Sequence, residues 1–224
     1  MVGRGTMGSR RLAAAIGALA LIAGLLVAEG GTPASAEPAF ACGHVHTGKA
    51  KGNPNPKGRP PLAIGDSTML LPIPNLTRVG YTVNGKGCRG FRQSIAVIKQ
   101  EKKAGRLPHL VAVAAYSNGG LRIGLVRQAL KAIGPKRVLV LVTQYDGDTG
   151  EPYAAGSEVL YAAEAAFPRQ VAVLDWVEHS LPHHTAAGGW FLGDLYHPNF
   201  EGAEAYARFL KRAFPYAREG RFPG

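Results

Sequence analysis

The chain alternates short apolar runs with longer segments in which apolar residues recur every three or four positions. The apolar runs predict buried strands at 62–65, 81–83, 110–115, 138–142 and 171–174. The helical spacing predicts helices at 91–104, 121–133, 156–167 and 203–214. Strands separated by helices of this length indicate right-handed crossovers and a parallel sheet. We therefore predict an α/β fold, a three-layer α/β/α sandwich around a five-stranded parallel sheet of flavodoxin-like order.

The N-terminal 36 residues depart from this pattern and have the layout of an export signal. Arg4, Arg10 and Arg11 precede a stretch of apolar or small residues at 12–27, and Ala34-Ser35-Ala36 provides a small-residue cleavage site. We predict a secretory signal peptide at 1–36 and a secreted protein, by the general or the twin-arginine route. The alternative is an uncleaved anchor, although the stretch is shorter than the ~20 residues that span a bilayer comfortably.

Residues 37–60 form a second segment with almost no apolar positions beyond its start, and they predict an extended arm before a single domain at 61–224. Cys42 in the arm and Cys88 in the domain are the two cysteines of the chain. An even count in an oxidising compartment favours a disulfide, which would pin the arm to the domain. Cys42, His44 and His46 could instead form a metal cluster, but a fourth ligand at a usual spacing is missing. We predict neither metal nor cofactor.

The charge of the predicted mature chain is strongly positive. Residues 37–224 contain 23 Lys and Arg against 14 Asp and Glu, a net charge of +9. This charge favours attraction to an anionic surface such as a cell-wall polymer. The alternative is that the charge reflects only an Arg-rich amino-acid usage and serves no binding function. The basic residues are spread without interleaved aromatic residues, so we predict no nucleic-acid partner.

Candidate chemistry lies in the loops that follow the predicted strands, which open on one edge of the sheet. Ser67 follows the first strand, and a serine becomes a nucleophile only when a base reaches it. Asp194 and His197, three residues apart before the last helix, can supply that base with an orienting carboxylate. Backbone N–H groups at 85–90 and the amide of Asn118 can stabilise an oxyanion.

Other polar residues at this edge are not predicted to take part in catalysis or metal binding. His183-His184 is a competing base, but it has no carboxylate at the spacing of a catalytic triad. Asp146 and Asp148 are expected at a solvated loop tip rather than at a metal site.

These stretches resemble the four sequence blocks of the SGNH (GDSL-type) hydrolases, over about 61–214. Residues 64–67 (Ile-Gly-Asp-Ser) are similar to the first block and 194–197 (Asp-Leu-Tyr-His) to the last. Asn118 fits the third block, and 83–91 resembles the second as it occurs in domains fused to polysaccharide acyltransferases. The resemblance implies Ser67 as nucleophile, His197 as base and Asp194 as its partner. It implies an oxyanion site at the N–H groups of Ser67 and Cys88 and the amide of Asn118.

Two further residues remain open between a binding and a structural role. Arg89, beside the second block, either binds a substrate carboxylate or braces the loop. Trp190 either packs under the last turn or forms a wall on which a sugar stacks.

The sequence thus predicts a monomeric, secreted serine esterase, and the resemblance implies removal of O-acetyl groups from extracellular or cell-wall carbohydrate. Lipid or thioester hydrolysis and acetyl transfer onto a glycan are alternative activities of the same triad. A catalytically silent, basic wall-binding module is the alternative from another class. We expect no membrane attachment after removal of the signal peptide.

Overall fold

The structure is a computed structural model that describes residues 42–218 and 220–223. The predicted signal peptide at 1–36 and the first residues of the predicted arm lie outside these ranges. Within the described part of the chain, no helix is both long enough and apolar enough to cross a membrane.

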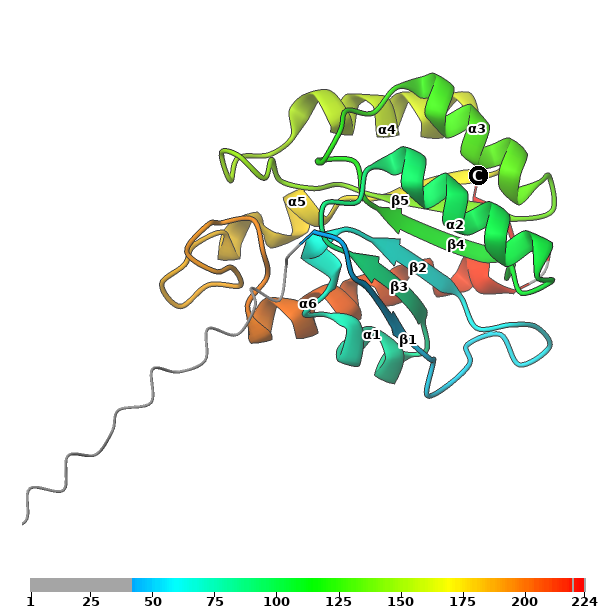
Figure 1. Ribbon diagram of the computed structural model, residues 1–224, viewed down its shortest axis with the longest axis horizontal. Helices are drawn as coiled ribbons and strands as arrows, with labels where there is room; N and C mark the ends of the chain where they lie inside the picture. The colour runs from blue at the N-terminus through cyan, green and yellow to red at the C-terminus, as the bar shows by residue number, and fades with distance from the viewer. Residues whose placement is uncertain (1–41, 219, 224) are drawn as a thin grey trace, which may run out of the picture. The chain divides into compact units, whose positions relative to one another are not determined.

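One mixed sheet forms the centre of the domain (Figure 1). Its strands are β1 (Val45–Gly48), β2 (Leu62–Gly65), β3 (Thr82–Lys86), β4 (Leu110–Ala114), β5 (Val138–Val142) and β6 (Val171–Leu174). The order is β1-β3-β2-β4-β5-β6, and all neighbours are parallel except β1, which pairs antiparallel with β3. The five predicted parallel strands and their flavodoxin-like order are confirmed.

Helices cover both faces of the sheet, as predicted for a three-layer sandwich (Figure 1). On one face α2 (Phe91–Lys103), α3 (Ile123–Ile133) and α4 (Ala154–Ala166) pack on a core that includes Val111 and Val113. The opposite core includes Ala112 and is covered by α1 (Ile73–Val79), α5 (Trp176–Ser180) and α6 (Phe200–Leu210). This alternation along β4 follows from the two-residue period of a strand.

The predicted arm at 37–60 was expected to be extended, without a helix or strand, but residues 45–48 within it form the strand β1. Val45 pairs with Lys86 and Gly48 with Val83, so main-chain hydrogen bonds to an open sheet edge hold this strand. Its residues are mostly exposed, and the strand therefore left no apolar pattern in the sequence. The short helices α1 and α5 were also missed, because each is too short for a helical period to stand out.

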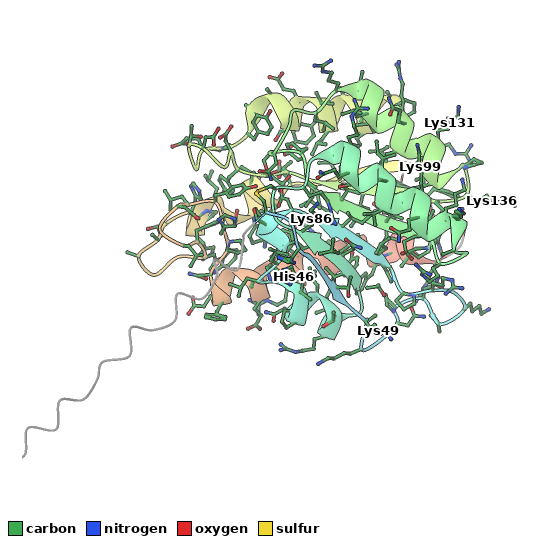
Figure 2. All side chains as sticks on the ribbon, in the orientation of Figure 1. His46, Lys49, Lys86, Lys99, Lys131 and Lys136 are labelled. Carbon is green, nitrogen blue, oxygen red and sulfur yellow. A yellow bond between two sulfur atoms is a disulfide. The ribbon has the colours of Figure 1, made fainter. Side chains whose placement is uncertain are left out.

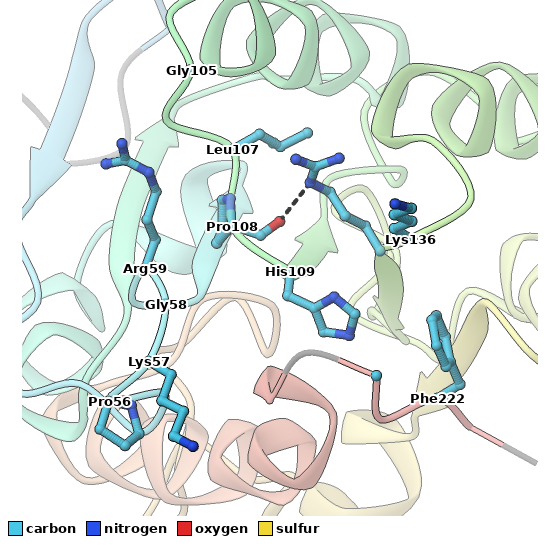
Figure 3. Close-up of a pocket in the computed structure, with 12 residues that line it drawn as sticks. Pro56, Lys57, Gly58, Arg59, Gly105, Leu107, Pro108, His109, Lys136 and Phe222 are labelled. Carbon is cyan, nitrogen blue, oxygen red and sulfur yellow. Dashed lines mark hydrogen bonds between the residues drawn. The ribbon is translucent and has the colours of Figure 1, made fainter.

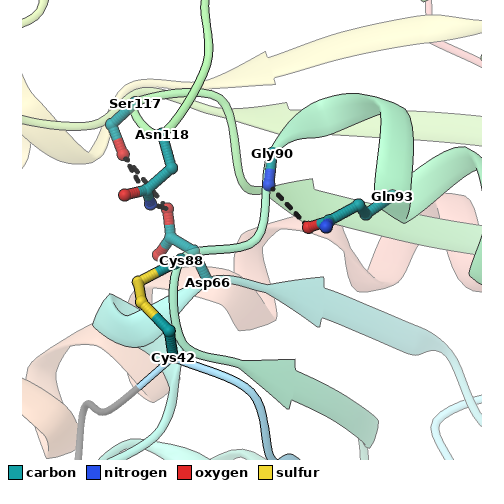
Figure 4. The surroundings of a disulfide bond; sticks show 7 residues. All are labelled: Cys42, Asp66, Cys88, Gly90, Gln93, Ser117 and Asn118. Carbon is teal, nitrogen blue, oxygen red and sulfur yellow. Dashed lines mark hydrogen bonds between the residues drawn. A yellow bond between two sulfur atoms is a disulfide. The ribbon is translucent and has the colours of Figure 1, made fainter.

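The predicted disulfide between Cys42 and Cys88 is present, with the two Cα atoms 5.1 Å apart. It joins the segment that leads into β1 to the loop that follows β3 (Figure 4). Because its sulfur is in the bridge, Cys42 is not available as the thiolate ligand of the alternative metal cluster.

Candidate active site

Ser67 lies at the carboxyl end of β2, in the first turn beyond the sheet. Gly65 ends the strand, and only glycine fits at this position because a Cβ would collide with the side chain of Met69. Asp66 then caps a 3₁₀ turn at Ser67–Met69 by accepting a hydrogen bond from Thr68 N at 3.0 Å. Ser67 itself is 6% exposed. The turn thus fixes the serine at the sheet edge where sites form in such folds.

Asp66 is the centre of a hydrogen-bond network that sequence reasoning missed. Its carboxylate is completely buried. Oδ1 accepts from the N–H and hydroxyl of Thr68, and Oδ2 accepts from four side chains, those of Ser117, Asn118, Gln144 and Tyr196. These donors come from the loops after β2, β4 and β5 and from the turn before α6. A buried carboxylate is tolerated only when its oxygens are satisfied in this way.

Asp194 and His197 form the pair predicted from their spacing. Asp194 Oδ2 lies 2.7 Å from His197 Nδ1, and Oδ1 accepts from the backbone N–H groups of Tyr196 and His197 at 3.0 and 2.9 Å. Burial raises the pKa of Asp194, but the hydrogen bonds from His197 and from the backbone outweigh it, so the pKa is lowered overall. The carboxylate therefore stays ionised and orients the imidazole through Nδ1.

Tyr196 connects this turn to the Ser67 loop. Its hydroxyl lies 2.6 Å from Ser117 Oγ and donates at 3.3 Å to Oδ2 of Asp66, which precedes Ser67 in the chain. Burial raises the pKa of Tyr196 well above its ordinary value, so the group stays a neutral donor. The rings of Tyr196 and His197 have centroids 4.7 Å apart. The structure thus brings the Asp194–His197 turn against the loop that carries Ser67.

The loops predicted to stabilise an oxyanion lie together beside Asp66 (Figure 4). Cys88 has a φ of +55°, which L residues seldom adopt, and this left-handed geometry turns the peptide chain sharply before Arg89. A Cβ on Gly90 would lie 3.2 Å from the carbonyl oxygen of Asn118, so the two loops approach closely. Asn118 Nδ2 donates to Asp66 Oδ2 at 3.2 Å, and an amide nitrogen carries a second N–H.

Arg89 lies under this loop and is 1% exposed. Its guanidinium donates to the carbonyl of Gly65 at 2.9 Å and to Asn84 Oδ1 at 2.6 Å. Burial lowers the pKa of Arg89 to about 10, and the charge of Asp66 opposes that shift. This placement fits the bracing alternative, because the side chain ties β2 to β3 and presents almost no surface to a substrate.

The aromatic residues around the last turn pack on one another. Trp190 is partly buried and stacks on His183, with ring centroids 3.8 Å apart, and on Trp176 at 5.9 Å. His184 stacks on Tyr145, and its Nε2 is 2.8 Å from the carbonyl oxygen of Leu195. Trp190 therefore fits the packing alternative, and His184 contacts the 194–197 turn through the carbonyl oxygen of Leu195.

Cation ligands do not gather at this edge. No three His, Cys, Asp or Glu residues among 42–218 and 220–223 could together hold a metal ion. Asp146 caps its own turn by accepting from the N–H groups of Asp148 and Thr149 at 2.8 and 3.3 Å. This is the loop-tip geometry expected from the sequence.

No family model and no curated protein matches the chain. Among solved structures, the C-terminal catalytic domain of Streptococcus pneumoniae peptidoglycan O-acetyltransferase A, determined with a methylsulfonyl adduct, superposes with a TM-score of 0.59. It shares 21% identity over 71% of this chain and 94% of that domain. A member of the lipolytic G-D-S-L family from Veillonella parvula gives a TM-score of 0.50 at 16% identity, covering 69% and 97% of the two chains.

The fold is that of the SGNH hydrolases. This agrees with the resemblance that the sequence blocks carry. Gln144 and Tyr196 are residues of the site to which the sequence assigned no role: Gln144 lies outside the four blocks, and Tyr196 is a position of the last block without an assigned function. Each is a single polar side chain whose role depends on a partner, Asp66, more than 70 residues away.

Proposed function

We propose that the protein is a secreted serine esterase that hydrolyses ester groups, chiefly O-acetyl groups, on extracellular or cell-wall carbohydrate. The observation that carries the proposal is the 2.7 Å contact of Asp194 with His197 on a turn that Tyr196 joins, through Asp66, to the Ser67 loop. A nucleophile, a base and an orienting carboxylate at one sheet edge are the parts that acyl transfer needs.

In the proposed reaction, Ser67 Oγ attacks the ester carbonyl carbon while His197 Nε2 takes the hydroxyl proton. Asp194 holds Nδ1 and stabilises the imidazolium that forms. The N–H groups of Ser67 and Cys88 and the amide of Asn118 donate to the oxyanion. The bond between the acyl carbon and the sugar oxygen then breaks, and His197 gives the proton to that oxygen, which leaves as the sugar hydroxyl. A water molecule next attacks the acyl-serine while His197 takes its proton, the bond from the acyl carbon to Ser67 Oγ breaks with return of the proton to Oγ, and the carboxylic acid leaves.

Carbohydrate is proposed as the substrate class by analogy. The second-block resemblance at 83–91 points to domains associated with polysaccharide acylation, and one of the similar folds is the catalytic domain of a peptidoglycan O-acetyltransferase. The positive charge of the chain suits an anionic wall polymer.

Acetyl transfer onto a glycan is the second candidate, favoured by that same structural likeness. Both reactions pass through the same acyl-serine, and they differ only in whether water or a sugar hydroxyl attacks it. The partition of the acetyl group between water and an added glycan acceptor distinguishes the two.

The test is hydrolysis of p-nitrophenyl acetate and release of acetate from an O-acetylated glycan. Ser67→Ala and His197→Ala should each lower kcat/KM by about 10³-fold or more while the protein stays folded. His183→Ala is the matched control, because it removes a neighbouring exposed imidazole and should leave turnover within about twofold of the wild type. Equal rates in wild type, Ser67→Ala and His197→Ala would refute the esterase and favour the silent wall-binding module.

A further inference from the structure

Charge is divided unequally between the two halves of the chain. Residues 42–140 contain 17 Lys and Arg against two carboxylates, whereas residues 141–224 contain six against eleven. Of the two carboxylates in the first half, Asp66 is buried and Glu101 is paired with Arg106 at 2.8 Å. An Arg-rich composition would have affected both halves, so the excess needs a local explanation.

The strand order turns this sequence asymmetry into a spatial one. β1 to β4 fill one side of the sheet and β5 and β6 the other. The strands of the basic half therefore lie together, with α2 and α3 on one face, while α6 from the other half packs against α1 on the opposite face. Lys99 and Lys131 project from α2 and α3, and Lys136 follows α3 (Figure 2). These lysines make the electrostatic potential positive over α2 and α3 and around the amino ends of the strands.

A hollow of about 810 Å³ opens at those amino ends, at the opposite edge of the sheet from Ser67. Three segments and the C-terminal tail line it: the chain before β2, before β4 and before β5 (Figure 3). They contribute Lys57, Arg59, Lys136 and Arg137, and no carboxylate belongs to the lining. Concave walls of low polarisability concentrate the field of such charges.

The cations of this hollow have no carboxylate partners. The ion pairs of the described residues involve none of Lys57, Arg59 and Lys136, and all three are exposed. Arg137 is fixed from behind, since it donates to the carbonyls of Pro108 and Ile133 at 3.1 and 3.0 Å, but carbonyl acceptors leave its charge uncompensated. Like charges held together repel one another, and an anion in the hollow would relieve that repulsion.

We propose that this amino-edge hollow binds an anionic glycan polymer, one that carries phosphate or carboxylate groups at regular intervals. Four cations spread over two chain segments that are distant in sequence suit a chain of repeated charges better than a single small anion. The proposal goes beyond the ester chemistry at the other edge and does not depend on it.

Two other polyanionic partners fit less well. The hollow has one aromatic side chain, Phe222, and its ring packs edge-on against His109 at 5.5 Å, so stacking platforms for nucleic-acid bases are lacking. Membrane binding usually adds apolar residues that insert among lipids. The large apolar side chains exposed in the described residues are Val45, Tyr161, Leu181 and Phe200, and none of them lines the hollow.

The experiment measures binding of two labelled soluble polymers, poly(glycerol phosphate) and polygalacturonate, to full-length protein carrying Ser67→Ala. The first probe carries phosphate and the second carboxylate, so the pair identifies the anion. The hollow variant combines Lys57→Gln, Arg59→Gln and Lys136→Gln. The matched control combines Lys99→Gln, Lys103→Gln and Lys131→Gln, which removes the same charge from exposed positions on α2 and α3.

We expect the hollow variant to bind at least one polymer about tenfold more weakly, and the control to change affinity by less than about threefold. The slope of log K against log salt should fall by about 2 in the hollow variant, since each lost anion contact releases fewer counterions. Equal losses in the two variants would mean attraction by net charge alone and would overturn the proposal. Binding to phosphatidylglycerol vesicles or to single-stranded DNA but to neither polymer would also overturn it.

Ester turnover distinguishes this proposal from the proposed function. In an otherwise wild-type chain, the hollow substitutions should leave hydrolysis of p-nitrophenyl acetate unchanged, because Ser67 lies at the other sheet edge. Loss of polymer binding with intact turnover therefore supports the hollow. If turnover proves absent from the protein, the binding result still stands.

Discussion

Two aspartates at the same sheet edge have contrasting surroundings. Asp66 is completely buried and accepts hydrogen bonds from four loops, whereas the side chain of Asp194 is 46% exposed and bonds mainly within its own turn. The first fixes where the loops stand relative to one another. The second holds one imidazole ring.

The contrast indicates that the two aspartates have different roles: Asp66 stabilises the arrangement of the loops, and Asp194 orients the proposed base. A buried carboxylate whose donors come from distant segments couples those segments, so removing it disturbs all of them at once. An exposed carboxylate in a local turn affects little beyond the ring that it orients. Substitution of Asp66 or of the residues that it joins should therefore lower stability, whereas substitution of Asp194 should lower turnover.

Asp66→Ala should have the largest effect on stability. Removing the carboxylate leaves the buried donors of Thr68, Gln144 and Tyr196 without their acceptor and should destabilise the fold by about 4 kcal/mol. Urea unfolding followed by circular dichroism measures this loss. Asp148→Ala, at an exposed loop tip, is the control and should shift the midpoint little. A loss for Asp66→Ala below about 1 kcal/mol would mean that the network does not join the loops.

The Cys42–Cys88 disulfide, like Asp66, should contribute to stability rather than to turnover. Opening it with Cys42→Ser and Cys88→Ser together should cost about 3 kcal/mol, since the bridge closes a loop across 46 positions. Because the Cys88 N–H remains in the double variant, we expect turnover on p-nitrophenyl acetate to stay within about threefold of the wild type well below the melting temperature. A much larger loss of kcat without unfolding would mean that the bridge positions the oxyanion donor.

Arg89→Lys tests whether this residue braces the loops or binds substrate. Lysine keeps the charge, but its single nitrogen cannot replace both guanidinium nitrogens, one of which donates to the carbonyl of Gly65 and the other to Asn84 Oδ1, so stability should fall by about 2 kcal/mol. KM should be unchanged for neutral and for carboxylated esters. A selective rise in KM for carboxylated esters, with normal stability, would restore the substrate-binding interpretation.

Some of this architecture follows from the sequence and some does not. The strands 138–142 and 110–114 are apolar throughout, and the pattern locates them because burial on both faces selects apolar residues. Ser67, Asp194 and His197 could be selected as candidates because their chemistry needs those residue types after strands or at that spacing. β1 was missed because main-chain pairing with β3 leaves no side-chain signature.

The sequence could not predict the roles of Gln144 and Arg89 or the existence of the hollow, because each depends on tertiary contacts. Gln144 acquires its role only when β5 ends beside β2 and its amide reaches Asp66 at 2.8 Å. The burial of Arg89 likewise depends on β3 lying against β2. The hollow needs the strand order itself, since Lys57 and Lys136 are far apart in the chain and line the same cavity.

Asp194 should have the smallest effect on stability, and that effect should depend on pH. Its pKa is lower in the folded protein than its ordinary value, so its contribution is fully present above the ordinary pKa and is lost as pH falls through the folded one. The half-exposed side chain keeps the contribution below about 1 kcal/mol. Asp194→Asn should therefore differ from wild type in melting temperature near neutral pH and approach it in acid, with Glu158→Gln as a control for the loss of an exposed carboxylate. A difference that grew towards acid would reverse the sign argued here, whereas turnover should fall in Asp194→Asn even where the melting temperatures agree.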